Sequence, residues 1–259
     1  MEAGFRTPLL DMFRRGEVSR EIKMLAARGA LAPRAHEQLM LLVELVGDPD
    51  PEIRRAAEAT LAAIPRAPLE SFLARSDTSP TLQGFFLARG IQAAAAQAAD
   101  LDEPLIDQGS PSEPPPEGEK ADKQSAVQRL SMMTIGERMK VAMKGTREER
   151  AVLIRDPNKL VSVAVLSSPK VNESEVEAFA KMANVSDEVL RIIGNTRAWI
   201  KNYGVTSALA RNPKTPVAIT LRLVQRLNDR DLKMISLDRN TQEPIKIAVR
   251  KRLMQGKKE

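Results

Sequence analysis

The stretch from Gly47 to Ile64, GDPDPEIRRAAEATLAAI, specifies where a helix begins, which side of it is buried and where it ends. Asp50 can accept hydrogen bonds from the amides of the first turn, and Pro51 stands at the first helical position, where a missing N–H costs nothing. Apolar or small side chains then recur every three or four residues. They are Ile53, Ala56, Ala57, Thr60, Leu61 and Ile64. The pattern predicts an amphipathic helix with one buried side.

A second helix precedes this one and completes a pair. Residues 36–46, HEQLMLLVELV, place Leu39, Leu42, Val43 and Val46 on one face, and only a Gly-Asp-Pro-Asp turn separates the two helices. We therefore expect an antiparallel helix pair. The DPDPEIRRAA string resembles the turn and second helix of a HEAT or armadillo-type repeat. This resemblance implies an α-solenoid, in which successive helix pairs stack and bury one another's apolar faces.

Similar turn strings recur in the second half of the chain, and each precedes an expected helix. They are Arg155-Asp156-Pro157, Ser167-Ser168-Pro169, Arg211-Asn212-Pro213 and Asp238-Arg239-Asn240. Their irregular spacing indicates degenerate repeats. Aromatic residues make up only 3% of the chain, so the core must be filled by aliphatic side chains, which suit packed helices. The predicted fold class is all-α.

Residues 99–126 differ sharply in composition from the rest of the chain. They hold five prolines, eight acidic residues and two lysines, a net charge of −6. Such a segment cannot bury enough apolar surface to offset the entropy lost on ordering, so we predict a disordered linker. The predicted organisation is a helical-repeat module over 1–98, the acidic linker over 99–126, and a basic helical-repeat module over 127–259. This two-part layout is also similar to that of uncharacterised bacterial proteins.

Several classes of protein are disfavoured by what the sequence lacks. There is no cysteine, which excludes disulfides, thiolate nucleophiles and zinc–cysteine sites. No apolar run reaches the roughly 18 residues that a membrane span requires. The first 20 residues mix acids and bases without a long apolar segment, unlike a signal or transit peptide. We expect a cytoplasmic protein.

The sequence offers little support for catalysis, and we predict no enzyme activity, cofactor or metal site. The single histidine, His36, stands at the start of an expected helix and fits an exposed or cap-proximal role better than a catalytic one. Paired acids at Glu148 and Glu149, Glu175 and Glu177, and Asp229 and Asp231 fall where helices begin, and negative charge is favourable there. No phosphate-binding glycine loop is present.

Charge distinguishes the two halves. Residues 1–98 carry no net charge, whereas residues 127–259 carry 26 basic and 14 acidic side chains, a net charge of +12. Within this half, Arg197, Trp199, Lys201 and Tyr203 lie close together in sequence and form the candidate binding surface. If the helix is unbroken, Trp199 and Tyr203 share one face and could stack a base beside bound phosphates. The competing interpretation, that both rings are core residues between repeats, is favoured.

These features favour a non-enzymatic interaction protein, an adaptor or scaffold whose helical-repeat surfaces bind a protein partner. The alternative is nucleic-acid binding through the basic second module. A DNA-modifying enzyme with a HEAT-like fold is a weaker third hypothesis, because no acid can be placed beside an aromatic pocket.

Overall fold

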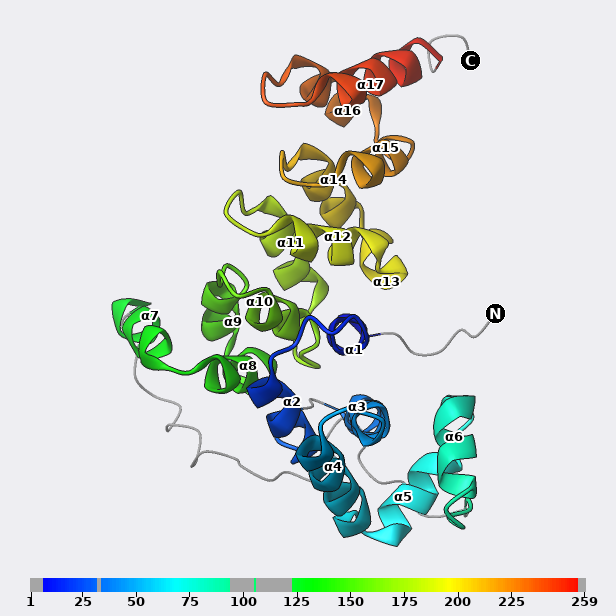
Figure 1. Ribbon diagram of the computed structural model, residues 1–259. Coiled ribbons are helices and arrows are strands. Elements are labelled where there is room, and N and C mark those ends of the chain that lie inside the picture. The colour runs from blue at the N-terminus through cyan, green and yellow to red at the C-terminus, as the bar shows by residue number, and fades with distance from the viewer. Residues whose placement is uncertain (1–6, 32–33, 94–104, 106–122, 256–259) are drawn as a thin grey trace. The chain divides into compact units, whose positions relative to one another are not determined.

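The computed structural model describes residues 7–31, 34–93, 105 and 123–255, and within these ranges the regular structure is entirely helical (Figure 1). The all-α prediction is confirmed for this part of the chain. Most of the predicted linker, 99–126, lies outside the described residues, but helix α7 (Lys123–Met132) includes its last four. The chain divides into two compact units. One comprises Met1–Arg150 and Val163–Lys170, and the other Ala151–Ser162 and Val171–Glu259.

The first unit is built from eight complete helices in the described residues. They are α1 (Pro8–Arg14), α2 (Arg20–Ala27), α3 (Ala35–Val46), α4 (Pro51–Ala63), α5 (Arg66–Leu73), α6 (Pro80–Leu87), α7 and α8 (Ile135–Lys144). Helices α9 (Arg147–Leu153) and α10 (Lys159–Leu166) each contribute residues to both units. The division into modules over 1–98 and 127–259 stays a prediction.

Helix α4 begins and packs as its sequence predicts. The Asp50 carboxylate accepts the backbone N–H of Glu52 at 2.9 Å, and Pro51 is the first helical residue. Ile53, Leu61 and Ile64 are 1%, 6% and 5% exposed, so the predicted apolar stripe faces the core. The partner helix α3 is buried more widely than predicted. Packed against α1, α2, α4 and α6, it has no fully solvated side near its middle.

The second unit repeats one packing relation. Its helices are α11 (Glu173–Lys181), α12 (Asp187–Asn195), α13 (Arg197–Ile200), α14 (Tyr203–Arg211), α15 (Val217–Val224), α16 (Asp229–Leu237) and α17 (Glu243–Gln255). Helix α14 packs between α11 and α16, and α15 packs between α12 and α17. The pairs α14/α15 and α16/α17 follow one another within this unit (Figure 1). Each middle helix therefore has neighbours on two sides.

The turn strings singled out in the sequence share one hydrogen bond. In each, one Asp, Asn or Ser side chain accepts the backbone N–H two residues later and so folds the chain back before the next helix. The residues are Asp48 (2.9 Å), Asp156 (2.8 Å), Ser168 (3.3 Å), Asn212 (3.0 Å) and Asp238 (2.9 Å). This local bond explains why Asp, Asn and Ser are interchangeable there although the repeats are otherwise irregular.

Three buried side chains also satisfy backbone carbonyls at or next to the end of an earlier helix. Thr60 donates to the Ala27 carbonyl at 2.7 Å. Ser168 donates to the Met143 carbonyl at 2.7 Å, and Asn212 to the Ala180 carbonyl at 2.8 Å. The last carbonyls of a helix have no partner within it, so a side chain that supplies one fixes the two helices relative to each other. No described helix is both long and apolar enough to cross a membrane.

Candidate functional site

A groove lies between α11 and α14 in the second unit, and its volume is about 450 Å³. Both helices are held by capped starts. Asn172 and Glu175 form a capping box at α11, and the Asn202 side chain accepts the backbone N–H groups of Gly204 and Val205 at α14. The groove is lined by Glu177, Lys181, Ala183, Tyr203, Gly204, Ser207, Ala208, Arg211, Asn212 and Pro213. Two well-anchored helices thus present side chains of both charges and a tyrosine to one hollow.

An ion pair and a glycine define the α11 side of the groove. Lys181 donates to the Glu177 carboxylate at 2.6 Å, one helical turn away. A methyl group at Gly204 would overlap the Glu177 carboxyl group, so any side chain at Gly204 would displace this acid. The close approach of α14 to Glu177 therefore depends on glycine at this position.

A buried carboxylate, Asp231, organises the α14 side. It belongs to the first turn of α16, where its own N–H is capped by the Asn228 side chain at 2.8 Å. Tyr203 donates to Asp231 Oδ2 at 2.5 Å and Ser207 donates to the same oxygen at 2.9 Å. Arg211 forms an ion pair with Asp231 Oδ1. Three side chains at successive turns of α14 are thus held by one acid.

This arrangement shifts the pKa values of both Tyr203 and Asp231. Burial by itself raises the pKa of Asp231, but the hydrogen bonds from Tyr203 and Ser207 and the charge of Arg211 outweigh burial and lower that pKa. Burial and the hydrogen bond to the Asp231 carboxylate raise the pKa of Tyr203. At neutral pH Asp231 is therefore ionised and Tyr203 is protonated. Neither member of this pair is therefore poised to transfer a proton near neutral pH.

The four residues predicted as a binding surface are not arranged on one helix. Arg197 and Trp199 lie in α13, Lys201 caps its C-terminal end, and Tyr203 begins α14. The helix is broken at Asn202, so the condition for Trp199 and Tyr203 to share a face is not met. Only Tyr203 lines the groove. Trp199 is half-buried, and Arg197 and Lys201 are exposed.

The acid that holds the groove residues Tyr203 and Arg211 was not identified as their partner from the sequence. Asp231 was interpreted only as helix-start chemistry, and this interpretation is confirmed because it lies in the capped first turn of α16. Its second role, as the acceptor for Tyr203 and Arg211, depends on packing between helices 20 to 28 residues apart. A single sequence contains no local signal for such pairs. His36, the other residue considered for chemistry, is half-buried and its ring lies 5.9 Å from that of Phe72.

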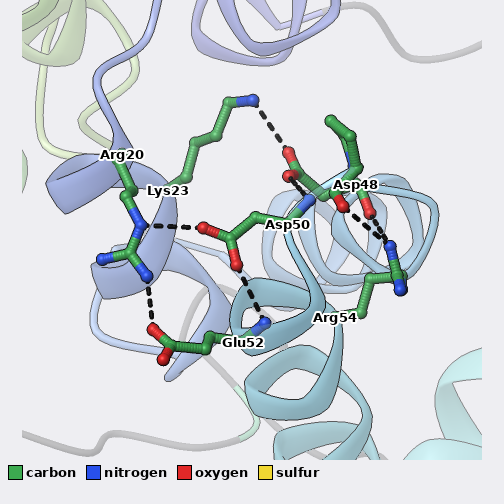
Figure 2. A network of polar contacts seen from close by, with 7 residues as sticks. Arg20, Lys23, Asp48, Asp50, Glu52 and Arg54 are labelled. Atoms are coloured by element: carbon green, nitrogen blue, oxygen red, sulfur yellow. Dashed lines mark hydrogen bonds and ion pairs between the residues drawn. The ribbon is translucent and has the colours of Figure 1, made fainter.

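A second polar cluster lies in the first unit, where α2 meets the start of α4 (Figure 2). Arg20 donates to Asp50 at 2.7 Å and also pairs with Glu52, while Lys23 donates to Asp48 at 2.8 Å. A hydrogen bond from the Glu52 backbone, followed by the bond from Arg20, lowers the pKa of Asp50. Arg54 donates to the carbonyls of Asp48 and Pro49. Every acid in this cluster already has a partner, so the cluster joins two helices.

The described residues contain no group of three or more His, Asp or Glu side chains arranged to hold a metal ion. Comparison of the chain with protein-family models, with curated proteins and with solved structures finds no match.

Proposed function

We propose that this chain is a non-enzymatic adaptor or scaffold that binds a protein partner in the cytoplasm through the surfaces of stacked helix pairs. The single observation that carries the proposal is the groove between α11 and α14, where Glu177, Lys181 and Tyr203 are presented from two capped helices. A peptide or helix edge lying there would meet both charges and an aromatic ring that retains a hydrogen-bonding hydroxyl. The arrangement of α11, α14 and α16, and of α12, α15 and α17, supports a HEAT or armadillo-like solenoid in this unit.

Blocking the groove tests this function. Ala183 is exposed and lines the groove, and no side-chain hydrogen bond is lost when it is replaced. Ala183→Trp should fill the groove without disturbing the packing. Full-length wild-type and variant chains would be used to capture proteins from a bacterial lysate, with quantitative mass spectrometry as the readout. Ala218→Trp is the matched control, because Ala218 is also exposed in the same unit but does not line the groove.

The expected result is a small set of proteins captured by wild type and by Ala218→Trp and lost from Ala183→Trp. Identical capture by all three chains would reject the groove as the binding site.

Nucleic-acid binding is the second candidate, favoured by the net charge of +12 over residues 127–259. Contacts with phosphates release counterions, so affinity for a generic duplex or single strand should fall steeply with salt. Fluorescence anisotropy with the full chain at low and physiological salt measures this directly. Tight, salt-sensitive binding that Ala183→Trp leaves unchanged would favour this candidate over the adaptor.

A further inference from the structure

The side of α16 that faces away from α14 carries a base and a large apolar residue. The same turn follows α14 and α16, and its first residues, Asn212 and Asp238, are 26 residues apart. At this offset Lys233 corresponds to Ser207, and Leu237 corresponds to Arg211. Both of the α14 residues contact Asp231 on the next helix. Lys233 and Leu237 therefore occupy the positions on α16 that, on α14, are covered by the next helix pair. No helix pair follows α16/α17 in the described part of the chain.

Helix α17 adds a second exposed stripe. Ile245 and Val249 are buried against the unit. On the opposite side Ile247, Arg250, Lys251 and Met254 recur at helical spacing and are not covered by the core, with Ile247 59% and Met254 69% exposed. Leu237 on α16 is 81% exposed. Large apolar side chains grouped on two neighbouring helices mark a contact surface more often than isolated ones do.

We define the outer face as the six exposed residues contributed by the two helices, Lys233, Leu237, Ile247, Arg250, Lys251 and Met254. It combines three bases with three large apolar side chains, and the exposed acids Asp229 and Glu243 lie one helical turn before Lys233 and Ile247. Glu243 lies on the same side of α17 as these bases, its carboxylate is 3.9 Å from Arg250, and both side chains are more than half exposed. Such a pair contributes little and leaves the face positively charged.

The rest of the chain indicates what chemistry covers a face of this kind. On α14, Arg211 and Tyr203 are covered by Asp231 in the first turn of α16. In the first unit, Arg20 on α2 is covered by acids at the start of α4 (Figure 2). In both places a base on one helix meets an acid on the next helix, beside apolar contacts. The complement of the outer face is therefore a helix with acids next to an apolar stripe.

We propose that the outer face binds an acidic amphipathic helix of another protein. The proposal rests on the adaptor function above and names the chemistry of one partner. A membrane surface fits less well. A helix that lies on a membrane keeps its apolar residues together on one side, whereas α17 buries Ile245 and Val249 in the protein and places its bases between Ile247 and Met254.

Designed peptides test the proposal with the full-length chain. One peptide of about 20 residues carries leucines at helical spacing with glutamates beside them, long enough to form a helix when bound. The matched peptide keeps the leucines and replaces every glutamate by lysine. Fluorescence anisotropy should detect binding of the acidic peptide and not of the basic one. In chains with ¹³C-methyl methionine, the Met254 resonance, assigned with Met254→Leu, should shift on binding.

Substitutions on the outer face should weaken binding without affecting folding, because the changed residues are exposed. Leu237→Ser and Lys251→Glu should each reduce affinity for the acidic peptide by roughly tenfold or more. Lys201→Glu is the matched control, since it makes the same charge change at an exposed position elsewhere in the unit. Unchanged circular dichroism melting curves would show that the variants fold.

Three results would overturn the proposal. They are no binding of the acidic peptide, equal binding of the basic peptide, and an equal loss of affinity in Lys201→Glu. Binding to phosphatidylglycerol vesicles that Lys251→Glu abolishes, without peptide binding, would assign the face to a membrane instead. Ala183→Trp separates this proposal from the groove, because blocking the groove should leave peptide affinity unchanged even if the capture experiment fails.

Discussion

Two buried carboxyl groups, Glu37 in the first unit and Asp231 in the second, have pKa values that are shifted in opposite directions. Glu37 is 3% exposed and Asp231 is 7% exposed, so both are withdrawn from water. Burial raises the pKa of Glu37 to about 7, with the hydrogen bond from Thr7 and the charge of Arg34 only partly opposing it. The pKa of Asp231 is lowered although burial acts on it in the same direction.

Glu37 is the more deeply buried of the two, and the hydrogen-bond donors around them also differ. Asp231 receives two hydroxyl groups and a guanidinium group, and its own backbone N–H is capped. Glu37 Oε1 meets no donor among the described residues. Burial thus destabilises a charge only where the protein does not replace the lost water. Protein donors replace the lost water at Asp231, which joins α14 to α16, but not at Glu37 in α3.

The apolar core of the α3/α4 pair provides a scale for the effects of both carboxyl groups on stability. We expect the largest loss of stability from a substitution in this core. Leu61 on α4 is 6% exposed, and Leu61→Ala should destabilise the first unit by roughly 2–5 kcal/mol because it leaves a cavity. Urea unfolding of the full chain measures the change. Glu58→Ala, an exposed substitution on the same helix, should have almost no effect. An unchanged transition in Leu61→Ala would mean that the buried face of α4 is wrongly assigned.

Replacing the less satisfied carboxyl group should stabilise the protein. A rise in pKa from 4.5 to about 7 corresponds to roughly 3 kcal/mol of destabilisation when Glu37 is charged. The folded form holds its proton to higher pH than the unfolded form does, so stability should fall as pH rises from about 4.5 to 7. Glu37→Gln should remove this dependence and be more stable than wild type above pH 7.

Melting temperatures between pH 4 and 8 check the prediction for Glu37, and Glu58→Gln serves as a control for loss of an exposed charge. If Glu37→Gln were less stable than wild type at pH 8, Glu37 would have to be a satisfied carboxylate like Asp231, and the contrast between the two would not hold.

The satisfied carboxyl group should behave in the opposite way. Asp231→Asn places an amide N–H₂ among donors, and we expect a loss of roughly 1–3 kcal/mol. Because the pKa of Asp231 is lowered in the folded protein, its stabilisation is present above the ordinary aspartate pKa of 3.8 and is lost as pH falls below it. The difference between variant and wild type, measured by urea unfolding, should therefore be constant from pH 8 to 5 and shrink near pH 3.

The smallest effect is expected for the tyrosine that lines the groove. Tyr203→Phe removes the bond to Asp231 and the weaker bond from the Asn228 backbone N–H at 3.3 Å. The expected loss is roughly 0.5–1.5 kcal/mol. A double-mutant cycle with Asp231→Asn should give a nonzero coupling energy, since the two side chains are in contact. Strict additivity would indicate that Tyr203 and Asp231 act independently.

Local chemistry made the helices and turns predictable from the sequence. Asp50 with Pro51, and the Asp48 and Asn212 turns, each depend on bonds within a few residues, and all form as predicted. The candidate binding surface was harder to predict from the sequence. The break at Asn202 was not recognised, although Asn followed by Tyr-Gly is a plausible helix start. The pairing of Tyr203 and Arg211 with Asp231 depends on how α14 packs against α16, and one sequence does not specify that packing.

The most direct test of the adaptor proposal is site-specific photo-crosslinking from the groove. A benzophenone side chain is introduced into the full chain at Ala183, which lines the groove, or at Ala218, an exposed position that does not. After irradiation in a cell lysate, we expect a discrete adduct from position 183 whose size nuclease leaves unchanged, and no such adduct from position 218. A nuclease-sensitive adduct, or the same adducts from both positions, would contradict protein binding in the groove.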